Sequence, residues 1–107
     1  MDAFEKLSIN GIIISKIDLL EVVKRYNIKE ISVFGSSIRN DFNPESDIDL
    51  LIEFIDSSQI SLLDLLDIQD FFKKLTKRNV DVVEPAGLKN PYRRESILRS
   101  KEILYVA

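Results

Sequence analysis

Val33-Phe34-Gly35-Ser36 and, after ten further residues, Asp47-Ile48-Asp49-Leu50 are the two motifs that decide the fold of this chain. The first motif ends an apolar run that begins at Ile31, which predicts a buried strand that turns sharply at its glycine. The second motif opens a run of strand composition that continues to Phe54, with polar and apolar residues alternating at its start. Because side chains two residues apart on a strand point to the same face, its two aspartates are expected to lie side by side. The motifs therefore predict two strands and a pair of carboxylates at one edge of a sheet.

A third strand is predicted at Val80–Val83, and Asp81 is its second residue. The segment between the second and third strands is long enough for a right-handed crossover helix, so these strands are expected to be parallel. Parallel strands begin at the same edge of a sheet, which places Asp81 beside the two aspartates of the second strand. If the first strand is antiparallel to the second, the Gly35-Ser36 turn also lies at this edge.

Helices are predicted before, between and after these strands. The predicted helices are an amphipathic one from Lys16 to Tyr26, one that begins with a capping box at Ser61 and Asp64 and ends near Thr76, and one that begins at Asn90-Pro91 and ends near Ser100. A hydroxyl of Ser36 or Ser37 is expected to cap a short helix that runs toward Asn40. The order of elements predicts an α/β (α+β) fold, in which helices flank a small mixed sheet of three or four strands.

Two segments are less clearly assigned by their sequence. Ile103–Val106 is expected to add a short strand. Ile9–Ile14 is apolar and β-branched around a glycine, and it fits a short edge strand, the start of a helix or a patch that faces a partner.

The composition excludes several kinds of chemistry. The 107 residues include no cysteine and no histidine, so no disulfide, thiol nucleophile or imidazole metal ligand can form. The length fits a single domain over residues 1–107, with a radius of gyration of roughly 13 Å. The net charge of 15 − 18 = −3 gives no general attraction for nucleic acid, although Lys89–Lys101 is locally basic. Without a membrane span or a signal segment, we expect a cytoplasmic protein. Because of the acidic charge balance, we expect no direct nucleic-acid partner.

The predicted edge of the sheet has the parts for phosphoryl or nucleotidyl transfer. Two carboxylates held together repel each other unless a cation lies between them, and such hard oxygen ligands suit Mg²⁺ or Mn²⁺. A glycine turn that opens a helix suits a phosphate, and two metal ions beside it could stabilise the attacking and leaving oxygens. The alternative for each motif by itself is a solvated strand end or an ordinary capped turn.

These residues resemble the signature of the polymerase-β-like nucleotidyltransferase superfamily, which is hydrophobic-Gly-Ser followed by Asp-x-Asp and a third carboxylate. The length and the run Ser46-Asp47-Ile48-Asp49-Leu50 look most like the minimal nucleotidyltransferases, the antitoxins of HEPN/MNT toxin–antitoxin pairs. The resemblance covers the chain from about Lys16 onward. It implies a palm-like nucleotidyltransferase fold.

The resemblance also implies a role for each matching residue. Asp47 and Asp49 would hold two Mg²⁺ ions, and Asp81 would hold the catalytic ion and help to activate the acceptor hydroxyl. Gly35 and Ser36 would grip the nucleotide phosphates. The family's first basic position after Gly-Ser is Ser37 here, Arg39 matches a second basic position that contacts phosphate, and Asn40 replaces a glycine.

Two functions follow as hypotheses. The first is transfer of AMP from ATP to a hydroxyl, on a tyrosine, of a partner HEPN ribonuclease, which silences this toxin. The second is a binding module that neutralises its partner by occlusion without catalysis. In either case we expect a stable complex with a partner protein, because 107 residues leave little surface for recognising a macromolecular acceptor. Whether the assembly is a homo- or a hetero-oligomer stays open at this point. Transfer to a small molecule such as an aminoglycoside would require a second substrate-binding domain.

Overall fold

The computed structural model describes all residues, Met1–Ala107, as four α-helices, four strands and three short 3₁₀ helices. The helices are α1 (Ala3–Ile9), α2 (Lys16–Tyr26), α3 (Leu62–Thr76) and α4 (Pro91–Ser100). The strands are β1 (Ile28–Phe34), β2 (Ile48–Phe54), β3 (Val80–Val83) and β4 (Glu102–Val106). The 3₁₀ helices are η1 (Gly35–Ile38), η2 (Ser57–Gln59) and η3 (Pro85–Gly87).

The strands form one mixed sheet in the order β3-β2-β1-β4. β2 and β3 are parallel and joined through α3, whereas β1 is antiparallel to both β2 and β4. This arrangement confirms the predicted mixed sheet, its parallel pair and the terminal strand. It also brings the end of β1 and the starts of β2 and β3 to the same edge.

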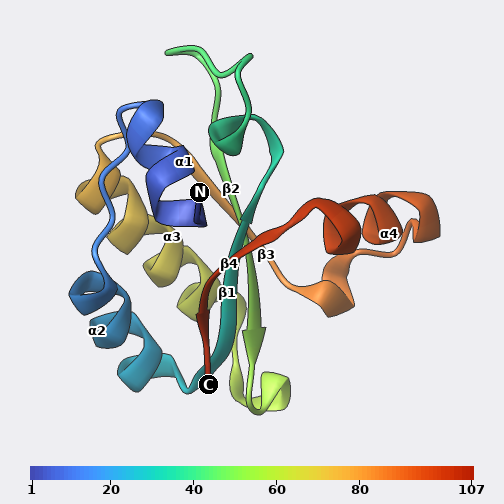
Figure 1. The fold of residues 1–107 in the computed structure, drawn as a ribbon. Coiled ribbons are helices and arrows are strands. Elements are labelled where there is room, and N and C mark those ends of the chain that lie inside the picture. Colours follow the sequence, from blue (N-terminus) through green and yellow to red (C-terminus); the bar gives the residue numbers. More distant parts are fainter.

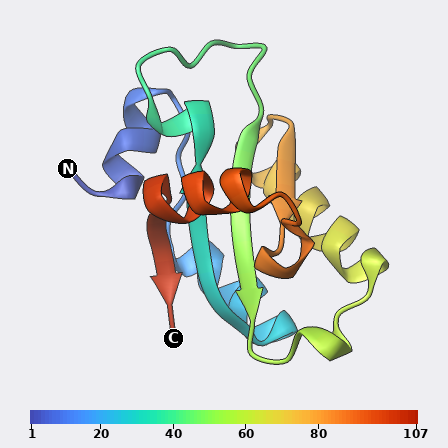
Figure 2. The ribbon, with the colours of Figure 1, turned by 90° about the vertical axis from the view of Figure 1, so that its right-hand side faces the viewer.

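The two faces of the sheet are covered unequally. Figure 1 shows α1, α2 and α3 on one face and α4 by itself on the other. In Figure 2, α4 crosses in front of the central strands, and the loop between η1 and β2 rises above the top of the sheet. We call the side that carries α4 the α4 face. No helix has the length and apolar composition that crossing a membrane requires.

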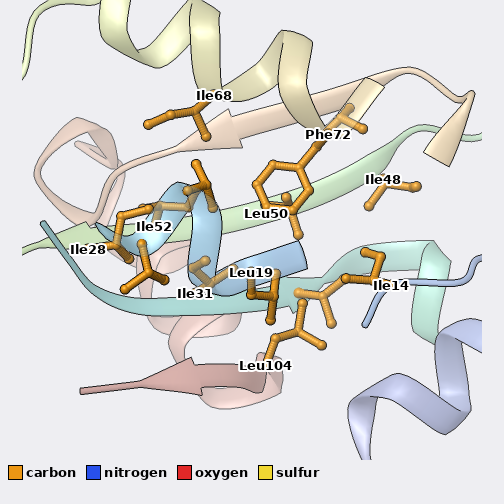
Figure 3. Close-up of a cluster of buried hydrophobic side chains, with 14 of the residues drawn as sticks. Ile14, Leu19, Ile28, Ile31, Ile48, Leu50, Ile52, Ile68, Phe72 and Leu104 are labelled. Carbon is orange, nitrogen blue, oxygen red and sulfur yellow. The ribbon is translucent and has the colours of Figure 1, made fainter. Parts of the chain in front are cut away.

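The main core fills the space between the sheet and the three helices on its other face. It contains 18 buried residues, and Figure 3 shows Leu50 and Ile52 of β2 facing Ile68 and Phe72 of α3. A second cluster on the α4 face has only four buried members, which are Phe34, Leu51, Leu88 and Ile97. Alternate residues of β2 therefore enter different cores, as the period of two on a strand requires.

Side chains cap the helices where the sequence predicts it. The Ser61 side chain accepts a hydrogen bond from the Asp64 backbone N–H at 3.1 Å, and the Asp64 carboxylate accepts one from the Ser61 N–H at 2.9 Å. The Asn90 side chain accepts hydrogen bonds from the first turn of α4, where Pro91 is the first residue. These caps confirm the predicted starts of α3 and α4.

Three details differ from the sequence-based expectation. Ile9–Ile14 is neither an edge strand nor a helix start, because Ile9 ends α1 and the following turn buries Ile12 and Ile14 in the main core. The first strand begins at Ile28 rather than Ile31. No serine hydroxyl caps η1: its N-cap residue is Phe34, which makes no side-chain cap. The turn is made instead by Gly35, whose φ is +79°.

Candidate active site

The three aspartates and the glycine turn meet at the edge where β1 ends and β2 and β3 begin. Asp49 is paired with Phe34 across the antiparallel ladder and with Asp81 across the parallel one. Asp47 lies one residue before β2. The structure therefore brings the residues of both motifs together with the third carboxylate, as their topology predicts.

Gly35 packs directly against Asp49. A Cβ atom built on Gly35 would lie 2.6 Å from Oδ2 of Asp49, closer than non-bonded atoms tolerate. The positive φ at Gly35 is a second reason for glycine at this position, because side chains disfavour the left-handed region. Glycine thus allows the backbone of the turn to lie against the central carboxylate.

Asp49 is half-buried and surrounded by like charges. Partial burial, followed by the negative charges of Asp81 and Asp47, raises the pKa of the Asp49 carboxyl above its ordinary value. The positive charges of Arg93 and Arg39 oppose this rise without cancelling it. None of the three aspartates forms an ion pair, so the edge carries an excess of negative charge.

The chemistry of these donors fits a hard divalent cation. Carboxylate oxygens are the ligands that Mg²⁺ prefers, and a bound cation would remove the repulsion around Asp49. The side chains do not yet converge on one point: no group of three or more acidic residues is arranged closely enough to hold a metal ion. Asp47 and Asp81 are exposed, so burial does not fix their side chains, and both would have to turn toward Asp49 to hold a cation with it.

The other predicted residues have different surroundings. Ser36 is partly exposed beside Gly35. Ser37 is fully buried and its Oγ makes no hydrogen bond, so its side chain points away from solvent. Arg39 is exposed, and its guanidinium donates to both carboxylate oxygens of Asp41, with Nε at 3.0 Å and Nη2 at 3.4 Å. A phosphate at Arg39 would have to compete with this pair.

Arg93 is a residue near the site that sequence reasoning placed only in a basic segment. It lies one helical turn before Ile97, which packs with Phe34 and Leu51 on the α4 face. Its positive charge acts on Asp49, and it forms no ion pair of its own. In the sequence, the only signal for Arg93 is that it lies four residues before an apolar residue, Ile97, on a predicted helix. Interpreting this spacing requires the position of α4 over β2, which the sequence does not give.

Comparisons with known proteins give a family match and a shared fold. The model of the nucleotidyltransferase domain family matches residues 16–104. The protein adenylyltransferase MntA of Thermococcus cleftensis is 33% identical over 86 residues, which are 80% of this chain and 82% of that protein. Among solved structures, a minimal nucleotidyltransferase is 30% identical with a TM-score of 0.68 and covers 99% of this chain and 97% of its own. A toxin–antitoxin crystal structure with AMP-PNP has a TM-score of 0.69 at 14% identity, and the match covers 88% of this chain and 75% of the matched chain. At this identity, the similarity supports the fold alone. From the family match and the shared fold, we conclude that this chain belongs to the nucleotidyltransferase domain family.

Proposed function

We propose that this protein transfers AMP from ATP to a hydroxyl group, on a tyrosine, of a partner HEPN-domain toxin, and that it acts as the antitoxin of that pair. The observation that carries the proposal is the position of Asp49 between Gly35 and Asp81, at the edge where all three strands meet. The similarity to a protein adenylyltransferase supports AMP as the transferred group and a protein as the acceptor.

The site residues divide the work of the reaction. The turn at Gly35 and Ser36 would receive the phosphates, because Gly35 places no side chain against Asp49. Asp47, Asp49 and Asp81 would hold Mg²⁺, with Mn²⁺ as a substitute. When bound, the metal would stabilise negative charge on the phosphates and on the attacking oxygen.

The transfer itself balances as a substitution at the α-phosphorus. The acceptor oxygen forms a bond to this phosphorus, the bond to the oxygen bridging the α- and β-phosphates breaks, and pyrophosphate leaves. The hydroxyl proton passes to a carboxylate. Asp81 suits this role, because it lies on the side of Asp49 opposite Phe34 and the Gly35 turn.

The test is the intact mass of the protein encoded beside this gene, after incubation with this protein, ATP and Mg²⁺. We expect the mass to increase by one or more AMP units. Asp49→Asn should abolish the increase while leaving the fold intact, since it removes a charge from a repulsive cluster. Asp67→Asn is the matched control, because Asp67 is exposed on α3 and forms no ion pair.

Two outcomes would change the proposal. A stable complex without any increase in mass would replace it with neutralisation by occlusion. An increase that persists in Asp49→Asn would remove the three aspartates from the mechanism.

A further inference from the structure

A basic cleft lies beside the candidate active site, and the mechanism above does not use it. Its volume is about 410 Å³, and it is bounded by the C-terminal end of α3 and the loop that leads into β2. Its lining includes three cations, Lys73, Lys77 and Arg78, and a single anion, Glu45. This local excess of positive charge contrasts with the net charge of −3 of the whole chain.

Two residues that line the cleft adjoin, along the chain, the strand starts that carry the aspartates. Ser46, which lines it, directly precedes Asp47, and Asn79, which also lines it, lies two residues before Asp81. The Asn79 carbonyl accepts a hydrogen bond from the Ile48 N–H at 2.9 Å, which joins the two walls. A chain that occupies the cleft would therefore lie next to the segments that begin β2 and β3.

Arg78 is held rigidly in this cleft. Its Nη2 donates to the carbonyl oxygens of Asn43 and Ser46 at 3.0 and 3.1 Å, and its guanidinium carbon lies 4.4 Å from the centroid of the Phe42 ring. The arginine thus contributes a fixed positive charge whose position is determined before any ligand arrives, which reduces the entropy cost of binding.

The two lysines supply charge that no acidic side chain neutralises. Neither Lys73 nor Lys77 forms an ion pair, whereas Lys74, on another side of α3, pairs with Asp70 at 3.0 Å. Lysines near a helix C-terminus also interact favourably with the helix dipole. That effect accounts for lysines at the end of α3, where Lys77 is the C-cap residue, but not for their position with Arg78 around one cleft.

The direction of approach indicates what the cleft binds. If the nucleotide phosphates lie at the Gly35 turn, on the β1 side of Asp49, the β3 side of Asp49 is left for the acceptor, and Asn79 of the cleft directly precedes β3. We propose that this cleft binds an acidic segment of the acceptor protein, next to the hydroxyl that receives AMP. The proposal rests on the proposed function.

The lining of the cleft favours a peptide over a nucleic acid. No hydrophobic residue lines it, and the ring of Phe42 is occupied by Arg78, so unstacked bases would find no aromatic surface. Carboxylates on an acidic peptide need only the three cations.

The experiment measures binding of a fluorescein-labelled, glutamate-rich peptide with one central tyrosine, beside a copy in which glutamine replaces every glutamate. We expect the acidic peptide to bind the full chain and the glutamine copy to bind much more weakly. Lys73→Gln/Lys77→Gln should weaken binding of the acidic peptide by about fivefold to tenfold, the effect of losing two exposed ion pairs. Lys16→Gln/Lys24→Gln is the matched control, because it removes two exposed, unpaired lysines of α2 and should change affinity less than about twofold.

Several results would overturn the proposal. One is equal affinity for the acidic peptide and its glutamine copy, and another is an equal loss of affinity in the Lys73→Gln/Lys77→Gln variant (the cleft variant) and in the Lys16→Gln/Lys24→Gln control. A third is tighter binding of a single-stranded RNA than of the acidic peptide, if the cleft variant loses it. A drop in AMP-PNP affinity in the cleft variant would assign the cleft to the nucleotide instead. If the acidic peptide binds as expected but the wild-type chain binds no AMP-PNP, the proposed function fails and the acidic-segment site remains.

Discussion

Substitution of Gly35 by alanine tests the close contact on which the site geometry depends. The new Cβ would meet Oδ2 of Asp49 at 2.6 Å, at a residue whose φ is +79°. A left-handed φ costs an L-residue about 1–2 kcal/mol, and displacing the half-buried carboxylate from its rotamer adds about 0.5–1.5 kcal/mol. Asp49 has little freedom to move, because its neighbour in the ladder is the like-charged Asp81. We expect Gly35→Ala to lower the free energy of unfolding by about 1.5–3.5 kcal/mol.

Two other glycines separate the contributions to this value. Gly11 has a φ of +78°, but a Cβ added there would have no neighbour within 4 Å, so Gly11→Ala measures the backbone cost without a clash. Gly87 has neither a positive φ nor a near neighbour, and Gly87→Ala should be neutral or stabilise the fold by up to about 1 kcal/mol. Urea denaturation followed by far-UV circular dichroism gives the three free energies on one scale.

A double-mutant cycle completes the test. Asp49→Ala removes the two atoms nearest to the new methyl group and leaves only the Asp49 Cβ, at 3.8 Å, an ordinary contact distance. In this background the extra cost of Gly35→Ala over Gly11→Ala should disappear, which gives a coupling energy of about 1 kcal/mol. Equal costs at Gly35 and Gly11, or a coupling energy near zero, would refute the close packing of the turn against Asp49.

Two further predictions concern charges around the sheet. Arg93→Ala should weaken AMP-PNP binding in the presence of Mg²⁺ by about tenfold, as expected for loss of one charge-assisted contact. Arg94→Ala is the control and should have little effect, because Arg94 lines a separate pocket with Lys29 and Glu84. Isothermal titration calorimetry would measure both affinities, and equal losses would exclude a special role for Arg93. Burial opposes ionisation of Glu30, but hydrogen bonds from Lys101 and Ser32 and the charges of Lys101 and Lys29 outweigh burial and lower its pKa below 4.5. The ion pair of Glu30 with Lys101 therefore stabilises the fold fully at pH values above the pKa of Glu30 in the unfolded chain. This stabilisation is lost as the pH falls through the lower pKa that Glu30 has in the folded protein. Lys101→Met should lose stability at pH 7 and show a flatter decline below pH 4.5 in thermal unfolding; an unchanged profile would contradict a stabilising role for this pair.

Local rules in the sequence predict most of the fold and the position of the aspartates. The capping pair Ser61 and Asp64 locates α3, and Asn90-Pro91 locates α4, because each uses hydrogen bonds within one turn. The seven-residue α1 was not predicted, although Asp2 and Glu5 form a capping box, because so short a helix depends on tertiary burial of Ala3 and Leu7.

Other parts of the site depend on contacts between distant segments. Gly35 and Asp49 are adjacent only because β1 and β2 pair in one register. The basic cleft requires the end of α3 to lie beside the loop before β2. The roles of Arg93 and Arg78 likewise follow from how helices and loops pack on the sheet. The serine cap expected for η1 was wrong, since backbone geometry at a glycine turned the chain without help from a hydroxyl.

The small apolar cluster beneath α4 gives the two faces of the sheet different local stabilities. Three helices and the sheet share 18 buried residues, whereas α4 is fixed by a cluster of four. Segments with few buried apolar contacts open at a lower free energy than the rest of a domain, as separate cooperative units. Amide protons of α4 should therefore exchange with solvent through local opening, while those of β1 and β2 exchange only on global unfolding. Such opening would uncover the Asp49 side of the sheet to a partner as large as a protein, and the strands that position the three aspartates would stay intact.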